Sequence, residues 1–335
     1  MAYRVGVTRE SFLPYGLGPL DRAGIAWELL AEETAELTPD QIASYDALLH
    51  SAARVTATTL DGADRLALLA RHGVGLDMVD LEACTMRGVA VTITPEGIRT
   101  PMASSALALI LALTHRLLDR DRAVRDGRWT QGRSGVVGLG LRGRTLGVIG
   151  FGTIGRELVR LIAPYEMQIL VTTPRLSAGE AEASGVTAVE LDALLRAADV
   201  VVVACPLNAE TRHLLDARRL ALLKPSALLV NVARGGIVDQ AALVAALREG
   251  RLAGAGLDVF EVEPLPSDDE LLELGNVVVS PHALGYTDEL FRGCVESACA
   301  AIAAVGCGRI PAHVANPAVL ANARFTEKLR RLSVL

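Results

Sequence analysis

The chain has few aromatic residues and no cluster of basic ones. Phenylalanine, tryptophan and tyrosine make up 4% of its 335 residues, whereas hydrophobic residues of all kinds make up 51%. We therefore expect a large core built mainly from alanine, valine and leucine. The formal net charge is −6, and lysine and arginine are not interleaved with aromatic residues in any stretch. This composition excludes nucleic acid as an expected partner.

Cysteine is also scarce, and the sequence lacks the patterns that are typical of secreted, metal-binding and membrane-spanning proteins. The five cysteines show no C-x-x-C spacing, and the six histidines show no ligand spacing. We therefore expect free thiols in a reducing cytoplasm and no metal site. The N-terminus lacks the basic start, apolar middle and cleavage site of a signal peptide. No uncharged apolar run reaches about 18 residues, so no membrane contact is expected, and residues 103–113 are predicted to form a buried helix.

The stretch over residues 145–175 carries the pattern around which the rest is organised. An apolar run leads into the sequence GFGTIG, and a segment with helical spacing and a second apolar run follow. In such a strand, turn and helix, Gly150 permits the sharp turn and Gly152 lets a pyrophosphate approach the backbone. Gly155 lets the helix lie close to the strand, and the helix N-terminus faces the phosphate charge. The stretch predicts a dinucleotide-binding unit.

Strand-like and helical segments alternate on both sides of this unit. The alternation predicts an α/β protein with a doubly wound parallel sheet (Rossmann) and a second, flavodoxin-like α/β substrate domain. We place the substrate domain at residues 1–98 with 287–335, and the dinucleotide-binding domain at residues 99–286. One long helix is predicted over residues 102–124, and the tail from Ala323 onward is expected to be charged and frayed.

Three polar residues follow predicted strands in the second half of the chain, namely Arg234, Glu263 and His282. Singly, each is compatible with an ordinary surface or loop role. Together they lie at successive strand ends of the nucleotide-binding sheet, where a cofactor's reactive end is expected. Histidine is the natural acid/base near neutral pH, and a carboxylate beside it favours the protonated imidazole. Arginine offers a planar fork of donors for a carboxylate and a carbonyl oxygen.

These residue types suit hydride transfer between a ketone and a hydroxy acid. The nicotinamide carries the hydride, so the protein has to position and polarise the substrate. A glycine-bearing loop that follows an earlier strand, RHGVGLDMVD, is a candidate site for an anion or substrate. Its position after a strand supports that role, because open α/β sheets bind ligands at the carboxyl ends of their strands.

Several motifs in order give the chain a family resemblance over residues 3–317. They are GVGLDMVDLEAC, GFGTIG, CPLNAETRHLLD, LLVNVARGGIVD, LDVFEVEP and SPHALGYTDE. With them the chain resembles the D-isomer-specific 2-hydroxyacid dehydrogenases. The resemblance implies an NAD- or NADP-dependent enzyme that acts on a small 2-oxo or 2-hydroxy acid, with its active site between two domains. It also implies a homodimer formed through the cofactor domains.

The resemblance also assigns roles to individual residues. His282 would be the general acid/base, Glu263 its partner, and Arg234 the residue that orients the substrate. Backbone amides of Val74 and Gly75 would bind the substrate carboxylate. The cofactor would contact Gly150, Gly152, Thr153, Ile154, Gly155, Thr173, Arg175, Cys205, Pro206, Thr211, Val232, Ala233 and Asp258.

Departures from the family pattern bear on cofactor and substrate. Many members carry an acidic residue that bonds the adenosine ribose, and Thr173 stands at that position here, followed by Pro174 and Arg175. Loss of a carboxylate removes repulsion toward a 2′-phosphate, so NADP is favoured over NAD. Met78 replaces the family's usual asparagine in the substrate loop, and Met102 begins a changed stretch in the long helix. The identity of the acid is therefore left open.

Three alternatives are compatible with parts of the sequence. Phosphite dehydrogenases have a similar CPLNAETRHLLD stretch but place a lysine where this chain has Val74. Formate dehydrogenases of the superfamily pair their histidine with glutamine, in contrast to Glu263. Some relatives are NAD(H)-sensing transcriptional corepressors, and the intact set of Arg234, Glu263 and His282 favours an enzyme over such a sensor.

Overall fold

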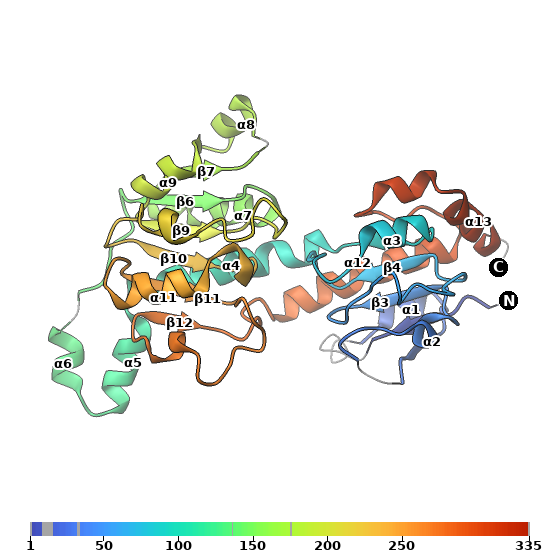
Figure 1. The fold of residues 1–335 in the computed structure, drawn as a ribbon, viewed down its shortest axis with the longest axis horizontal. Helices are drawn as coiled ribbons and strands as arrows, with labels where there is room; N and C mark the ends of the chain where they lie inside the picture. Colours follow the sequence, from blue (N-terminus) through green and yellow to red (C-terminus); the bar gives the residue numbers. More distant parts are fainter. Residues whose placement is uncertain (1, 9–15, 32–33, 136, 175, 334–335) are drawn as a thin grey trace. The chain divides into compact units, whose positions relative to one another are not determined.

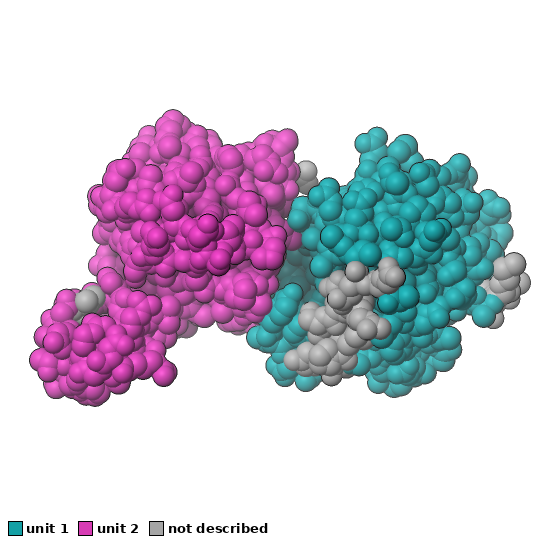
Figure 2. Space-filling view, turned by 60° about the horizontal axis from the view of Figure 1, so that its bottom comes forward, with its two compact units in different colours: residues 1–98, 286–335 teal, residues 99–285 magenta. Residues whose placement is uncertain are grey.

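The fold is that of a computed structural model, which describes residues 2–8, 16–31, 34–135, 137–174 and 176–333. The chain divides into two compact units, coloured separately in Figure 2. Unit 1 comprises residues 1–98 and 286–335, and unit 2 comprises residues 99–285. Each unit has its own parallel sheet and its own core.

In its described part, unit 1 holds a five-stranded parallel sheet with helices packed against it (Figure 1). The strands are β1 (Val5–Val7), β2 (Trp27–Leu29), β3 (Ala47–His50), β4 (Leu68–Arg71) and β5 (Ala90–Thr92). The helices are α1 (Gly18–Arg22), α2 (Pro39–Ile42), α3 (Leu81–Met86), α12 (Asp288–Gly306), η5 (Pro317–Ala321) and α13 (Ala323–Leu332). The strand order is β2-β1-β3-β4-β5, which is the flavodoxin-like order, so the predicted class of this unit is confirmed.

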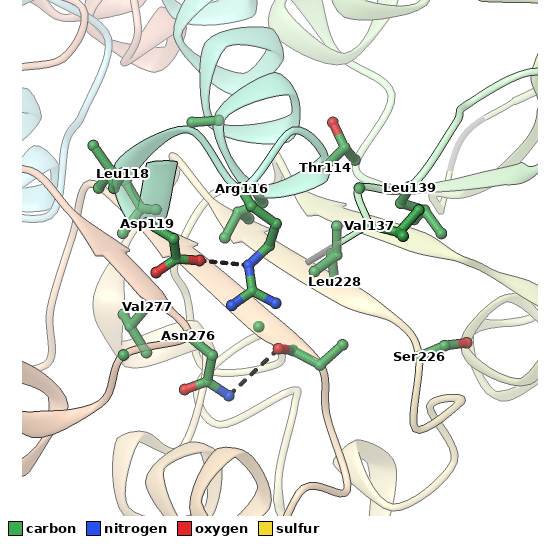
Figure 3. A pocket seen from close by; sticks show the side chains of 17 residues that line it. Thr114, Arg116, Leu118, Asp119, Val137, Leu139, Ser226, Leu228, Asn276 and Val277 are labelled. Atoms are coloured by element: carbon green, nitrogen blue, oxygen red, sulfur yellow. Dashed lines mark hydrogen bonds and ion pairs between the residues drawn. The ribbon is translucent and has the colours of Figure 1, made fainter. Parts of the chain in front are cut away.

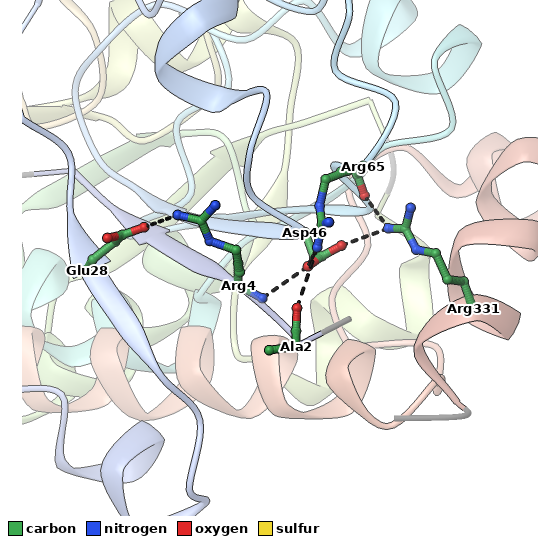
Figure 4. A network of polar contacts seen from close by, with 6 residues as sticks. All are labelled: Ala2, Arg4, Glu28, Asp46, Arg65 and Arg331. Atoms are coloured by element: carbon green, nitrogen blue, oxygen red, sulfur yellow. Dashed lines mark hydrogen bonds and ion pairs between the residues drawn. The ribbon is translucent and has the colours of Figure 1, made fainter.

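The C-terminal helix α13 is docked on unit 1, and the expectation of a frayed tail is wrong for residues 323–333. Phe325 and Leu332 are each 1% exposed. The buried Asp46 accepts hydrogen bonds from the Arg4 amide (3.0 Å), from Arg65 (2.6 Å) and from Arg331 of α13 (2.7 Å; Figure 4). Arg331 of the tail thus pairs with a buried carboxylate, which sequence spacing alone did not reveal.

Unit 2 holds a seven-stranded parallel sheet in the residues that are described (Figure 1). Its strands are β6 (Thr145–Ile149), β7 (Gln168–Thr172), β8 (Thr187–Ala188), β9 (Val200–Val203), β10 (Leu228–Asn231), β11 (Gly254–Leu257) and β12 (Val277–Val279). The order β12-β11-β10-β9-β6-β7-β8 is that of a Rossmann sheet, so this prediction is also confirmed. The order reverses between β6 and β9, and the carboxyl ends at such a point form the crevice where dinucleotides bind.

Helices cover both faces of this sheet, and the strand sequences explain why. Apart from α5 (Leu117–Arg125) and α6 (Trp129–Ser134), which extend away from the sheet, the described helices of unit 2 are α4 (Pro95–Thr114), α7 (Thr153–Ile162), η2 (Ala163–Tyr165), α8 (Ala178–Ala183), α9 (Leu191–Ala197), α10 (Ala217–Leu220), η3 (Gly235–Ile237), α11 (Gln240–Arg248) and η4 (Glu270–Glu273). Val200 and Val202 of β9 face the core that includes α4 and α7. Val201 and Val203 face the core that includes α9 and α11. A strand buried on both faces has to be apolar throughout, which is typical of parallel sheets.

The predicted long helix over residues 102–124 is two helices, α4 and α5. The chain turns at Arg116, whose φ is 51°, in the left-handed region. The carbonyl of Thr114 accepts a hydrogen bond from the amide of Leu139 (2.7 Å) instead of one from the next helical turn. The break thus comes from a segment distant in sequence. In the described chain, α4 has a length and hydropathy compatible with a membrane span, but 56% of that stretch is buried inside the protein, as in a core helix.

Candidate active site

The glycine turn after β6 has the geometry that its sequence predicts. Gly150 has a φ of +95°, and a Cβ there would lie 2.7 Å from the backbone nitrogen of Cys205. A Cβ on Gly155 would lie 2.4 Å from the carbonyl oxygen of Gly150. Both positions therefore require glycine, for the turn and for close packing of α7 on β6. Gly152, in contrast, has no atom of the described residues within 4 Å of a Cβ position, so the described part of the chain leaves its surroundings open.

This turn fits a dinucleotide pyrophosphate. Gly152 is the N-cap of α7, and the amides of Thr153 and Ile154 open its first turn. No protein acceptor bonds these two amides within the described residues. Unpaired amides and the helix dipole favour an anion at such an end. The open space over Gly152 lets a phosphate approach the backbone closely.

The other residues assigned to the cofactor lie around the same crevice. Thr173 follows β7, and Cys205 and Pro206 follow β9 next to Gly150. The Thr211 hydroxyl donates to the Pro206 carbonyl (2.7 Å), which ties the loop after β9 together. Val232 and Ala233 follow β10. Arg175 lies outside the described residues, so its assignment stays a prediction from sequence.

Glu263 and His282 lie in direct contact. The Nδ1 atom of His282 is 2.7 Å from Oε2 of Glu263. The other carboxylate oxygen, Oε1, accepts a hydrogen bond from the amide of Phe260 (2.9 Å). His282 has a φ of 53°, and both side chains remain about one-third or more exposed. Because Nδ1 faces the carboxylate, the Nε2 atom is the one left for proton exchange with a substrate.

The surroundings keep Glu263 ionised. Burial acts to raise its pKa, but the hydrogen bond with His282, the Phe260 amide and the charges of His282 and Arg234 together lower it. Folding therefore makes this carboxyl a stronger acid than a free glutamic acid, whose pKa is about 4.3. At neutral pH it is therefore a carboxylate, which accepts a hydrogen bond from Nδ1 of His282.

A buried carboxylate, Asp258, holds the loop that carries His282. Asp258 is 1% exposed, and its Oδ1 atom accepts hydrogen bonds from the amides of Ala283 and Leu284, each at 3.1 Å. Burial raises its pKa, against the opposing hydrogen bond from Ser280. From sequence, Asp258 was assigned to the cofactor, and that assignment stays a prediction. The structure shows in addition that Asp258, which lies in the LDVFEVEP motif, fixes the backbone next to His282.

Arg234 is positioned by the backbone around it. It follows β10 as the N-cap of η3, and its carbonyl accepts a hydrogen bond from the Asn231 side chain (2.9 Å). A Cβ on the next residue, Gly235, would lie 1.8 Å from the carbonyl carbon of Phe260. Only glycine allows this approach, which brings the Arg234 backbone beside the loop that leads to Glu263.

The structure also contains a second histidine–glutamate pair, which was not expected from the sequence. Nε2 of His213, in the loop after β9, contacts Oε1 of Glu261, in the loop after β11. Glu261 is two residues before Glu263, so this pair links the two loops. Both residues lie within motifs that carry the family resemblance, but the sequence gave no sign that they pair.

Val74 and Gly75 lie in unit 1, in the loop after β4. Gly73 has a φ of +116°, and no atom in the described part of the chain lies within 4 Å of a Cβ position there. Over the described chain, the amides of Val74 and Gly75 donate to no protein acceptor. Two such amides side by side are suited to an anionic group.

Comparison with known proteins identifies the family. Residues 107–283 match the sequence profile of "D-isomer specific 2-hydroxyacid dehydrogenase, NAD binding domain". The chain is 38% identical to a glyoxylate reductase of Thermococcus onnurineus over 302 residues, which cover 88% of this chain and 90% of that protein.

Solved structures agree with the sequence match. An NADPH-dependent glyoxylate/hydroxypyruvate reductase from Sinorhizobium meliloti, in complex with NADP and malonate, superposes with a TM-score of 0.80 at 30% identity and covers 91% of this chain and 93% of that chain. A D-lactate dehydrogenase from Aquifex aeolicus, with NAD and lactic acid, gives a TM-score of 0.78 at 28% identity, with 88% and 93% covered.

The fold and the site thus define a nicotinamide-dependent oxidoreductase. The chain belongs to the D-isomer-specific 2-hydroxyacid dehydrogenase family. The resemblance inferred from the motifs is confirmed, and so is the interpretation of the chain as an NAD(P)-dependent 2-hydroxyacid dehydrogenase.

Proposed function

We propose that this enzyme interconverts a small 2-oxo acid and the corresponding D-2-hydroxy acid, with His282 as general acid/base. The observation that carries the proposal is the 2.7 Å contact between His282 Nδ1 and Glu263, which leaves Nε2 for the substrate. The bound nicotinamide supplies or accepts the hydride. In reduction, His282 donates its Nε2 proton to the substrate oxygen, and in oxidation the neutral imidazole takes that proton back.

The charges of the substrate are met by different groups. Arg234 orients and polarises the substrate through its guanidinium, whose positive charge already acts on Glu263. The amides of Val74 and Gly75, which lack protein acceptors in the described structure, take the carboxylate. The names of the relatives favour substrates as small as glyoxylate, hydroxypyruvate or lactate. A panel of 2-oxo acids, each assayed with NADH and NADPH, tests the proposal.

For the cofactor, the proposal favours NADP over NAD. The residue that follows β7 is Thr173, which carries no charge to repel a 2′-phosphate, and a basic residue stands two positions later in sequence. A carboxylate at the end of this strand would instead bond the ribose hydroxyls of NAD. One structural relative was solved with NADP and another with NAD, so both chemistries occur on this fold.

The proposal includes a homodimer, because two helices project from unit 2 as an arm and expose apolar side chains. Helices α5 and α6 pack mainly on each other and extend away from the sheet (Figure 1). Leu117, Val124 and Trp129 on this arm are 56%, 55% and 64% exposed. Part of its charge is paired internally, as in Arg125 with Asp121 (2.8 Å) and Arg128 with Asp126 (2.7 Å). The arm therefore combines exposed apolar surface with ion pairs of its own.

A pocket of about 240 Å³ lies beside the base of this arm (Figure 3). It is lined by Leu118, Val137 and Leu139, and by residues where β10, β11 and β12 begin. It is thus at the amino ends of these strands, opposite to the end where Arg234 and His282 lie. A second copy of this chain is the occupant we infer. In a dimer with a two-fold axis, each copy can cover the arm and the pocket of the other copy.

Replacing His282 by alanine should reduce kcat by at least about 100-fold, because a positioned acid/base is worth roughly 10²–10⁴-fold. Cofactor affinity should stay near that of the parent, since His282 is not part of the glycine turn. Steady-state kinetics and a fluorescence titration with NADPH measure the two effects. The matched control is His213→Ala, which removes the other histidine–glutamate pair. A His282→Ala enzyme that retained a tenth of its kcat would contradict the assignment.

Replacing Glu263 by glutamine should move the pH profile in opposite senses for the two directions. Without the carboxylate the protonated imidazole is less favoured, so reduction should fail at a lower pH than in the parent. Oxidation, which needs the neutral imidazole, should persist to lower pH.

Glu263 itself is not the group whose titration sets these pH limits, because its pKa lies below the ordinary value of a glutamic acid. The control for the pH profile is Glu261→Gln, which should leave both limits unchanged. Identical profiles for Glu263→Gln and the parent would show that Glu263 does not act on His282.

Replacing Thr173 by aspartate should weaken NADPH binding by like-charge repulsion and strengthen NADH binding through the ribose hydroxyls. Arg175→Ala should weaken NADPH alone, by the roughly 1.5–3 kcal/mol of a charge-assisted contact. Dissociation constants of both cofactors for the parent and the two variants decide the matter. The NADP preference would be refuted if the parent bound NADH tenfold more tightly than NADPH and Arg175→Ala changed neither dissociation constant. The dehydrogenase proposal would then remain intact.

Leu118→Asp should weaken self-association at least about tenfold, since a charge in the centre of an apolar contact is costly. The parent should run as a dimer in size-exclusion chromatography with light scattering, and the variant should dissociate on dilution. Met86→Asp, at an exposed apolar position of unit 1, is the matched control. A parent that stays monomeric at high concentration would refute the homodimer.

A further inference from the structure

The carboxyl ends of β3 and β4 in unit 1 carry two buried basic side chains. His50 ends β3 and Arg71 ends β4, and the two residues are direct partners in the parallel register. They are 0% and 5% exposed. Ligands of open α/β sheets bind beyond the carboxyl ends of the strands, so these side chains lie beneath the end of the sheet where a ligand is expected.

A chain of hydrogen bonds connects these two residues to the loops above them. Arg71 Nε donates to the Gly75 carbonyl at 2.6 Å, and Arg71 Nη1 lies 3.4 Å from His50 Nδ1. Nε2 of His50 bonds the Ala53 carbonyl. A guanidinium only donates, so His50 Nδ1 has to accept and the imidazole carries its hydrogen on Nε2. Burial and then the charge of Arg71 lower the pKa of His50 to about 3, in agreement with this neutral tautomer.

The loop over residues 73–75 is thus held at both ends. At its start, the Gly73 amide donates to the Thr94 hydroxyl (2.8 Å), and the Thr94 amide donates to the Gly73 carbonyl (3.0 Å). At its end, Arg71 holds the Gly75 carbonyl. The Val74 and Gly75 amides between these anchors have no protein acceptor in the described chain. Because the Gly75 carbonyl is held toward the buried Arg71, the peptide groups of this short loop keep one orientation.

We propose that Arg71 is a positioning residue that sets the affinity for the substrate, by holding the Gly75 carbonyl so that the Val74 and Gly75 amides present a preformed site for the carboxylate. The inference rests on the proposed function, which assigns the substrate carboxylate to these amides. Arg71 acts through the loop and not by contact, because its guanidinium is buried beneath it. A preformed site avoids the cost of ordering the loop on binding. The effect belongs to ground-state binding, and proton transfer at His282 does not depend on it.

The decisive variant is Arg71→Met, which keeps the length of the side chain and removes its donors. KM for the 2-oxo acid, and the inhibition constant of oxamate, an unreactive substrate analogue, should rise roughly 10- to 100-fold. The kcat at saturating acid should stay within about threefold. The dissociation constant of NADPH should not change, because the glycine turn is in the other unit. Arg71→Lys, which keeps the positive charge but lacks the planar fork of donors, should give an intermediate KM.

The matched control is Arg65→Met. Arg65 is another arginine of unit 1, but its guanidinium bonds Asp46 and not the substrate loop. This variant should lower the Tm while KM and the oxamate constant stay at the parent values. If Arg71→Met is too unstable to assay, Arg71→Lys carries the test. A folded Arg71 variant whose KM equals that of the parent would overturn the inference. A kcat that falls together with Tm while KM stays constant would also overturn it.

Failure of this inference is distinguishable from failure of the proposed function. A parent enzyme that reduces 2-oxo acids, with Arg71 variants of unchanged KM, refutes the role of Arg71 alone. A parent that reduces no acid of the panel with either cofactor refutes the proposed function, and the inference with it.

Discussion

The constraint on which the whole structure depends is that a parallel sheet has to be covered on both faces. Strands such as β9, whose four residues are all valine, have no room for polar chemistry because each side chain is packed under a helix. Reactive groups are therefore confined to the loops at the strand ends. All strands of a unit run in one direction, so these loops gather at one edge. Arg234, Glu263 and His282 in unit 2, and the Val74–Gly75 loop in unit 1, all follow carboxyl ends.

At these edges, backbone contacts position the side chains that face solvent. The amides of Ala283 and Leu284 are held by the buried Asp258, and the Phe260 amide holds one oxygen of Glu263. In unit 1, Arg71 holds a carbonyl of its loop in the corresponding way. Both units thus use a buried polar side chain that bonds the backbone of a loop assigned to the proposed site. Such bonds cost little entropy on ligand binding, because they are already made in the folded protein.

The comparison of sequence and structure is clearest at particular residues. The roles of Gly150 and Gly155 were predictable, because the tight turn and the close packing of α7 on β6 leave no room for a Cβ at either position. The contact between Glu263 and His282 was predictable too, since parallel strands bring their ends together. Arg71, by contrast, appeared only as the first letter of a loop motif. Its pairing with His50 depends on the register of β3 and β4, which the sequence does not display.

The sequence by itself determined the class of both sheets, the glycine turn and the set of polar residues at the strand ends, because hydrophobic periodicity and glycine geometry are local properties. Only the tertiary structure decided where α4 ends, how α13 docks and which side chains are buried beneath the functional loops. The Thr114 carbonyl is taken by Leu139, and Arg331 reaches Asp46 across 285 positions of sequence. Such partners are determined by how distant segments of the chain pack against each other. A local sequence pattern carries no information about that packing.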